Sequence, residues 1–260
     1  KQSDWFKAVL NDSILGESSF DRSKLRQSSL IGCDVSRTVW SEVEGDGADL
    51  SWGICKNSKM TSCSFSGADW YESVLLELVA KSTDWSGANL MNVDCRRAKL
   101  VECNFTDSLM SEISLIQSTL ERCNLSGADL RGAYLIGAVF RECNLEGADL
   151  SMCDGYDQVL VESTGEKRGE FFGVDLSGSR LSGCYASGSK FGKIKLAGCD
   201  MRGSNFERAD LRGADLSGSD CRGARFGGAD LTGASLAETL LLEANLSGSV
   251  LRDCKLPSDM

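Results

Sequence analysis

Residues 209–218 read Ala-Asp-Leu-Arg-Gly-Ala-Asp-Leu-Ser-Gly, which is one five-residue unit written twice. An apolar residue stands at every fifth position of residues 5–150 and, one residue out of phase, of residues 171–256. Of these 48 central positions only Gly45 is not apolar, and a small residue stands two positions before nearly all of them. Neither the 3.6-residue period of an α-helix nor the 2-residue period of a strand gives this register. The sequence therefore predicts a repeat architecture.

The unit Ala-(Asp/Asn)-Leu-x-x is clearest in Ala128–Gly132, Ala148–Met152 and Ala209–Gly218. It resembles the repeat of the pentapeptide-repeat family, and the resemblance covers about nine-tenths of the chain. The resemblance implies an all-β fold, a right-handed, four-sided β-helix solenoid of about twelve coils. It also implies one repeat on each side of a coil, with the central and the small residues both pointing inward.

We expect one continuous domain of a larger protein, since the repeat is already in phase at the first residues. Residues 1–152 are the first repeat block and residues 171–257 the second, with a loop or irregular coil at 153–170 between them. The flanking central residues are 21 positions apart, one coil plus one residue, so either a whole coil with a bulge or a projecting loop fits. The polar composition of the interruption favours the loop.

Twelve cysteines follow the five-residue beat instead of a metal-binding or disulfide spacing, and no C-x-x-C occurs. By register, nine stand on small inward positions and three on central positions. We therefore expect buried, free thiols that act as small apolar side chains. Many free thiols indicate a reducing compartment, so we expect a cytoplasmic protein, or an effector released into a host cell.

Composition excludes several classes of function. Histidine is absent, which removes the commonest general base and the usual zinc ligand. No phosphate-binding glycine motif, signal peptide or membrane-spanning apolar run is present. The net charge of −10 disfavours nucleic acid and anionic membranes as direct partners. We expect no enzyme, and no catalytic, cofactor-binding or metal-binding residues.

One side of the first block, centred on Leu15 and on every twentieth residue after it, has apolar neighbours where a surface is usually polar. An apolar stripe of this kind is typical of a binding surface. The alternative is that β-branched residues stabilise the ladder without binding anything. The candidate protein-binding residues are Ile14, Ile54, Val74, Leu76, Ile116, Tyr134 and Ile136 on this side and Trp52, Tyr71 and Met91 on the adjacent one.

Two functions fit these patterns. The first is a non-catalytic protein–protein interaction scaffold within a bacterial secretion-system effector or adaptor, whose partner is an unidentified protein or a second copy of the chain. The second is suggested by the quinolone-resistance members of the family, which bind DNA gyrase by mimicking DNA. Acidic residues on two sides favour the second function, whereas the uneven, Trp-rich first block departs from the regularity of those members. The acidic residues are Asp4, Glu44, Asp49, Asp69, Asp84, Asp129 and Asp149.

Overall fold

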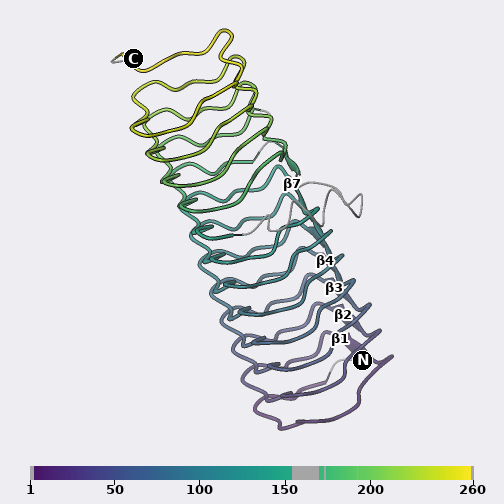
Figure 1. Cartoon of the computed structure of the whole chain (residues 1–260). Coiled ribbons are helices and arrows are strands. Elements are labelled where there is room, and N and C mark those ends of the chain that lie inside the picture. The colour runs from purple at the N-terminus through teal and green to yellow at the C-terminus, as the bar shows by residue number, and fades with distance from the viewer. Residues whose placement is uncertain (1–2, 154–169, 173, 192, 259–260) are drawn as a thin grey trace.

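The structure is a computed structural model that describes residues 3–153, 170–172, 174–191 and 193–258. These residues form a rod of stacked coils, with the two chain ends at opposite ends of the rod (Figure 1). The described part contains strands, bridges and turns but no helix, and so none that is long and apolar enough to cross a membrane.

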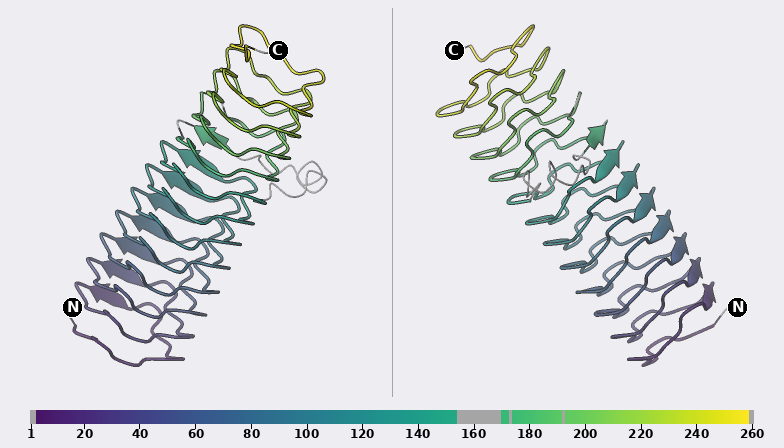
Figure 2. Two further views of the ribbon diagram at one scale, coloured as in Figure 1. Left: turned by 90° about the vertical axis from the view of Figure 1, so that its left-hand side faces the viewer. Right: turned by 45° about the vertical axis from the view of Figure 1, so that its right-hand side comes forward.

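Eight short strands form one parallel sheet in sequence order, and they line one side of the rod (Figure 2). Each strand pairs in register with the strand of the next coil, so that Phe20 lies beside Trp40 and Leu100 beside Leu120. The strands are β1 (Ser19–Asp21), β2 (Val39–Ser41), β3 (Lys59–Thr61), β4 (Val79–Lys81), β5 (Lys99–Val101), β6 (Thr119–Glu121), β7 (Val139–Arg141) and β8 (Glu170–Phe172).

The other three sides of each coil are joined to the next coil by single parallel bridges, usually to the residue 20 positions on. In one coil, Phe20 is central on the strand face, Leu25 on the second face, Leu30 on the third face and Val35 on the fourth face. These four face names are used below for every coil. The four-sided β-helix that the resemblance to pentapeptide repeats implies is confirmed.

The five-residue period follows from the turn at each corner. At Leu125, the central carbonyl oxygen accepts a hydrogen bond from the N–H of Ala128, at 3.1 Å. The third residue of this turn, Gly127, has a φ of 66°, as a type II turn requires. Ala128 is then fully buried beneath the corner. One repeat is therefore one central residue, two turn residues, one small buried residue and one outward residue.

The interruption between the blocks does not add a coil. Phe171 in β8 pairs directly with Phe140 in β7, 31 positions earlier instead of 20, and their ring centroids are 5.0 Å apart. The alternative of a whole extra coil is therefore wrong. Cys153 and Glu170, which the sequence analysis assigned to the interruption, both belong to the β-helix: Cys153 donates its N–H to Leu150, and Glu170 begins β8. The rest of the predicted loop, residues 154–169, lies outside the described residues.

The core explains the one central position that is not apolar. A Cβ atom on Gly45 would lie 2.4 Å from two ring carbons of Phe65 in the next coil. Phe65 is fully buried and packs edge-on against Trp40 and Trp70, with ring centroids 5.8 Å and 5.1 Å away. Gly45 therefore leaves the space that this aromatic cluster fills.

The cysteines lie inside the rod, as their register predicts. All twelve are free; eleven are buried and Cys254 is half-buried. Burial raises the pKa of the Cys55 thiol, and likewise that of Cys199 and Cys221, to about 12. These thiols are therefore protonated and unreactive at neutral pH.

Candidate protein-interaction surface

The apolar stripe that the sequence predicts on the fourth face is interrupted. Along this column of bridges, Asp34 lies between Ile14 and Ile54, and Asp94 and Ser114 lie between Val74 and Tyr134. Ile14 is 85% exposed and isolated from the other apolar residues by one coil. The apolar residues of this column therefore do not form one continuous stripe, because polar residues stand on the intervening coils. Ile54 and Val74 remain direct neighbours.

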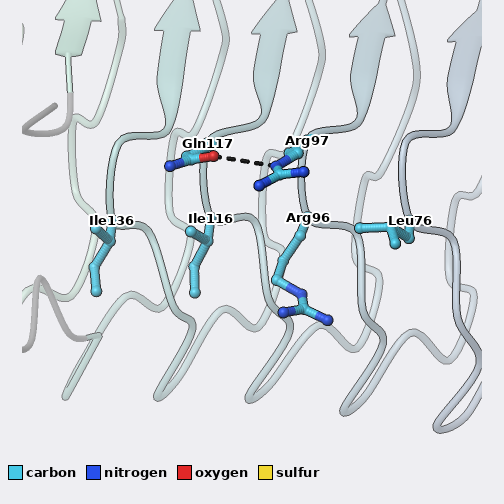
Figure 3. A pocket seen from close by; sticks show the side chains of 6 residues that line it. All are labelled: Leu76, Arg96, Arg97, Ile116, Gln117 and Ile136. Atoms are coloured by element: carbon cyan, nitrogen blue, oxygen red, sulfur yellow. Dashed lines mark hydrogen bonds between the residues drawn. The ribbon is translucent and has the colours of Figure 1, made fainter. Parts of the chain in front are cut away.

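A second column, at the edge between the fourth face and the strand face, brings three of the predicted residues together. Leu76, Arg96, Ile116 and Ile136 stand on four successive coils (Figure 3). Ile116 and Ile136 are direct neighbours, as expected, and the three aliphatic side chains are half-buried. They line a surface groove of about 340 Å³.

Three polar residues complete the groove, and sequence reasoning missed them. Arg96 stands between Leu76 and Ile116, while Arg97 and Gln117 form a parallel row beside it (Figure 3). The twenty-residue spacing could have found them, since Arg96 is one coil from Leu76 and from Ile116. They were missed because only apolar residues were considered as candidates.

The two arginines are positioned by neighbouring side chains but keep much of their surface in water. Arg96 donates from Nε and Nη2 to the two carboxylate oxygens of Asp94, at 2.8 and 2.7 Å, and this pairing raises the pKa of Arg96. Arg97 donates from Nε to Gln117 at 3.2 Å and lies 3.5 Å from a carboxylate oxygen of Glu77. Their side chains are 51% and 63% exposed. The groove thus combines aliphatic side chains with accessible guanidinium groups.

The remaining predicted residues gather at the edge between the third and fourth faces. Trp52 is 53% exposed, and its ring meets that of Tyr71 edge to face, with centroids 6.0 Å apart. Met91 follows Tyr71 on the next coil and accepts the N–H of Glu72 at its carbonyl oxygen. This group is separate from the groove, because the fourth face lies between the two edges.

The acidic residues of the repeat have a structural role. Asp129 accepts the backbone N–H of Arg131 at 3.2 Å, and it also accepts the Nε–H of that residue at 2.7 Å. The same bond to the N–H two residues on is made by Asp49 and Asp69, and by asparagine at Asn104. Asp and Asn at this position therefore satisfy a corner N–H, which accounts for much of the negative charge.

The acidic residues do not line up into a column. On the second face, Asp4 and Glu44 are separated by Lys24, and neutral residues follow Asp84 at Asn104. On the described part of the third face, aspartates on two adjacent coils are followed by a neutral residue or by arginine. Asp149, for example, is followed by Arg180, and their charged groups are 3.1 Å apart. The described part of these faces thus lacks the continuous acidic column that a DNA mimic would present. It also holds no cluster of three potential metal ligands.

A model of the pentapeptide-repeat family matches residues 80–107, 108–154, 179–218, 189–226 and 219–256, with eight copies of the repeat. These matches span more than half of the chain, and the protein belongs to the pentapeptide-repeat family. No curated protein matches it in sequence.

Several solved structures are similar to this chain. HetL, a pentapeptide-repeat protein involved in heterocyst differentiation regulation from the cyanobacterium Nostoc sp. strain PCC 7120, is 24% identical, with a TM-score of 0.33 and coverage of 85% of this chain and 86% of its own. The plasmid-mediated fluoroquinolone resistance protein QnrB1 is 24% identical, with a TM-score of 0.24 and coverage of 89% and 92%. A pentapeptide-repeat protein of the Arabidopsis thaliana thylakoid lumen is 22% identical, with a TM-score of 0.19 and coverage of 54% and 79%. At these values the similarities carry no argument about function.

Proposed function

We propose that this protein is a non-catalytic scaffold that binds a partner protein in the groove of Leu76, Ile116 and Ile136. The observation that carries the proposal is the groove itself: three aliphatic side chains and two accessible arginines at one edge of a rigid rod. The same position on the three coils before Leu76 carries Gly16, Ser36 and Lys56. A surface that combines aliphatic contacts with guanidinium donors suits a partner with aliphatic and acidic side chains.

The spacing of the groove favours an α-helical partner segment that lies along the rod. Adjacent coils are about 4.8 Å apart, so the four positions of the column span about 14 Å. Measured from position i along the helix axis, positions i+3, i+7 and i+10 lie at about 4.5, 10.5 and 15 Å, close to the spacing of the coils. In an extended partner strand, alternate residues are about 6.7 Å apart, so their side chains no longer match the coil spacing after two coils. The matching helix has aliphatic residues at i, i+7 and i+10 and a carboxylate at i+3, opposite the arginines.

A defined peptide tests this proposal. We expect a fluorescein-labelled amphipathic peptide of about 18 residues, with leucine at i, i+7 and i+10 and glutamate at i+3, to bind in an anisotropy titration. The triple variant Leu76→Ser, Ile116→Ser, Ile136→Ser should bind it at least about tenfold more weakly, a loss of about 1.4 kcal/mol. A matched control, Val39→Ser with Val79→Ser, alters exposed apolar residues on the strand face and should bind like the parent.

A charge exchange keeps the test informative if the triple variant folds poorly. Arg97→Glu changes an exposed side chain, so the fold should tolerate it. It should weaken binding of the glutamate peptide and strengthen binding of a peptide with lysine at i+3. Absence of binding to the parent, or equal binding to all variants, would remove the groove as the partner site.

The cellular setting is part of the proposal. Twelve free thiols support a reducing compartment such as the cytoplasm. A place within a bacterial effector or adaptor is consistent with a rigid binding rod, and identification of the partner is the experiment that tests it.

A further inference from the structure

Trp52 is unusual in its backbone position. It is the third residue of its corner turn, with a φ of 55°, a conformation that is uncommon for bulky residues. The other non-glycine residues with positive φ in the described part are polar or flexible, and none is aromatic. Its ring is nevertheless 53% exposed, so burial does not offset the backbone strain. Strain of this kind is often found at binding sites.

The exposed ring is held by specific contacts. Trp52 donates its indole N–H to Oε2 of Glu72 at 3.2 Å, and its backbone N–H to the carbonyl oxygen of Tyr71 at 2.8 Å. The planes of the two aromatic rings are 83° apart. The Tyr71 hydroxyl also bonds to Glu72, which raises the pKa of Tyr71. Two aromatic rings on adjacent coils are thus fixed around one carboxylate, and we call Trp52, Tyr71 and Glu72 the aromatic corner.

The charge around the aromatic corner is negative, and its acids form no ion pair among the described residues. Asp49 and Asp69 stack on adjacent coils, and Glu112 acts on Tyr71 electrostatically. Within the described residues, none of these acids nor Glu72 forms an ion pair. By contrast, Asp129, farther along the same face, is paired with Arg131 at 2.6 Å. The aromatic corner thus has the charge that a cationic ligand would complement.

The chemistry of the aromatic corner favours guanidinium. A planar guanidinium stacks on an aromatic face and donates in a fork to a carboxylate, whereas an ammonium group is a compact, strongly hydrated charge. Glu72 keeps acceptor capacity beyond its bonds to the two aromatic side chains, since a carboxylate has about four acceptor sites. We propose that the aromatic corner is a binding site for an arginine side chain of a partner segment, which stacks on Trp52 and pairs with Glu72. This site is distinct from the groove and does not depend on it.

The probe is N-acetyl-arginine amide, titrated at millimolar concentration into the full chain. The readout is the indole N–H resonance of Trp52 among those of the five tryptophans. We expect this resonance alone to shift and to saturate. The lysine analogue should bind at least about threefold more weakly, and the uncharged citrulline analogue should give no saturable shift.

Variants separate the proposed site from general attraction to an acidic protein. Glu72→Gln keeps the side-chain shape and should weaken arginine binding at least about fivefold. Glu142→Gln removes a carboxylate from the equivalent repeat position on the strand face, where φ is 52°, and should leave binding unchanged. The proposal is overturned if citrulline shifts Trp52 as arginine does, if all five indole resonances move alike, or if Glu72→Gln binds arginine like the parent.

Discussion

The two halves of the rod differ most at their corners. In residues 3–153, 22 non-glycine residues have positive φ against 8 glycines, whereas among the described residues of 170–172, 174–191 and 193–258 the numbers are 5 and 11. A non-glycine residue in this conformation costs about 1 kcal/mol or more, although Asn and Asp are tolerated better. The first half therefore accepts backbone strain at most of its corners, and the second half largely avoids it.

The strained corners carry side chains that glycine cannot supply. Arg97 and Gln117 of the groove, and Trp52 of the aromatic corner, all occupy them, with φ of 58°, 58° and 55°. In the second half, outward charges largely neutralise each other, as in the pairs of Asp200 with Arg202 and of Asp220 with Arg222. This difference fits our proposal that the first half displays a binding surface, while the second half extends the rod.

The largest expected effect concerns the core of the first half. Gly45→Ala places a methyl group against the ring of Phe65, and overpacking of this kind typically costs about 1–3 kcal/mol. We expect a clear drop in the urea midpoint followed by tryptophan fluorescence. In a chain that already carries Phe65→Leu, Gly45→Ala should cost less stability than it does in the parent. A Gly45→Ala variant as stable as the parent would show that the aromatic cluster is loosely packed.

A smaller effect should separate the two kinds of corner. A Cβ atom on Gly218 would meet no atom within 4 Å, so Gly218→Ala tests backbone strain alone, which we expect to cost about 1 kcal/mol. Gly218→Asn should cost less, because Asn tolerates positive φ. The reverse change in the first half, Gln117→Gly, should leave stability equal or slightly higher. If Gly218→Ala is neutral in thermal unfolding, corner strain does not distinguish the halves.

The smallest effect concerns the charged pairs of the second half. The hydrogen bond from Arg212 lowers the pKa of Asp210 in the folded chain. Its contribution to stability is therefore present above the unfolded value of about 3.9 and is lost as the pH falls through the lower folded pKa. Asp210→Asn keeps an acceptor for the corner N–H, as Asn104 does, and should cost less than about 0.5 kcal/mol at pH 7.

The Asp210→Asn variant should also lose less stability than the parent when the pH falls from about 5 to about 2. Urea unfolding at each pH measures this loss. An identical acid profile for parent and Asp210→Asn would mean that the pair with Arg212 contributes nothing.

Much of the fold is predictable here because each repeat uses the same local chemistry. The beat of central residues places the twelve thiols on inward positions, and the resemblance of the repeat unit to a known family implies the four faces; only local sequence is needed for either. The step from Phe140 to Phe171 was not predictable, because the beat alone does not say on which face the chain resumes stacking. Gly45 was likewise unexplained until Phe65, one coil away, was seen to fill its space.

The binding surface was predictable only in part. The twenty-residue spacing places Ile116 beside Ile136, but the list of apolar residues hid Asp34, Asp94 and Arg96 between its members. Trp52 was predicted only as an apolar residue at an outward repeat position. Its bond to Glu72 depends on side-chain geometry across two coils, which a sequence pattern does not specify.

The most direct test of the account is to map where the groove peptide binds on the whole rod. A photo-reactive version of the peptide, cross-linked to the full chain and analysed by mass spectrometry, should label the edge that carries Leu76, Ile116 and Ile136. Residues 170–258 should remain essentially unlabelled, and unlabelled peptide should compete the signal away. Cross-links spread equally over both halves would contradict the claim that the strained corners of the first half form the binding surface.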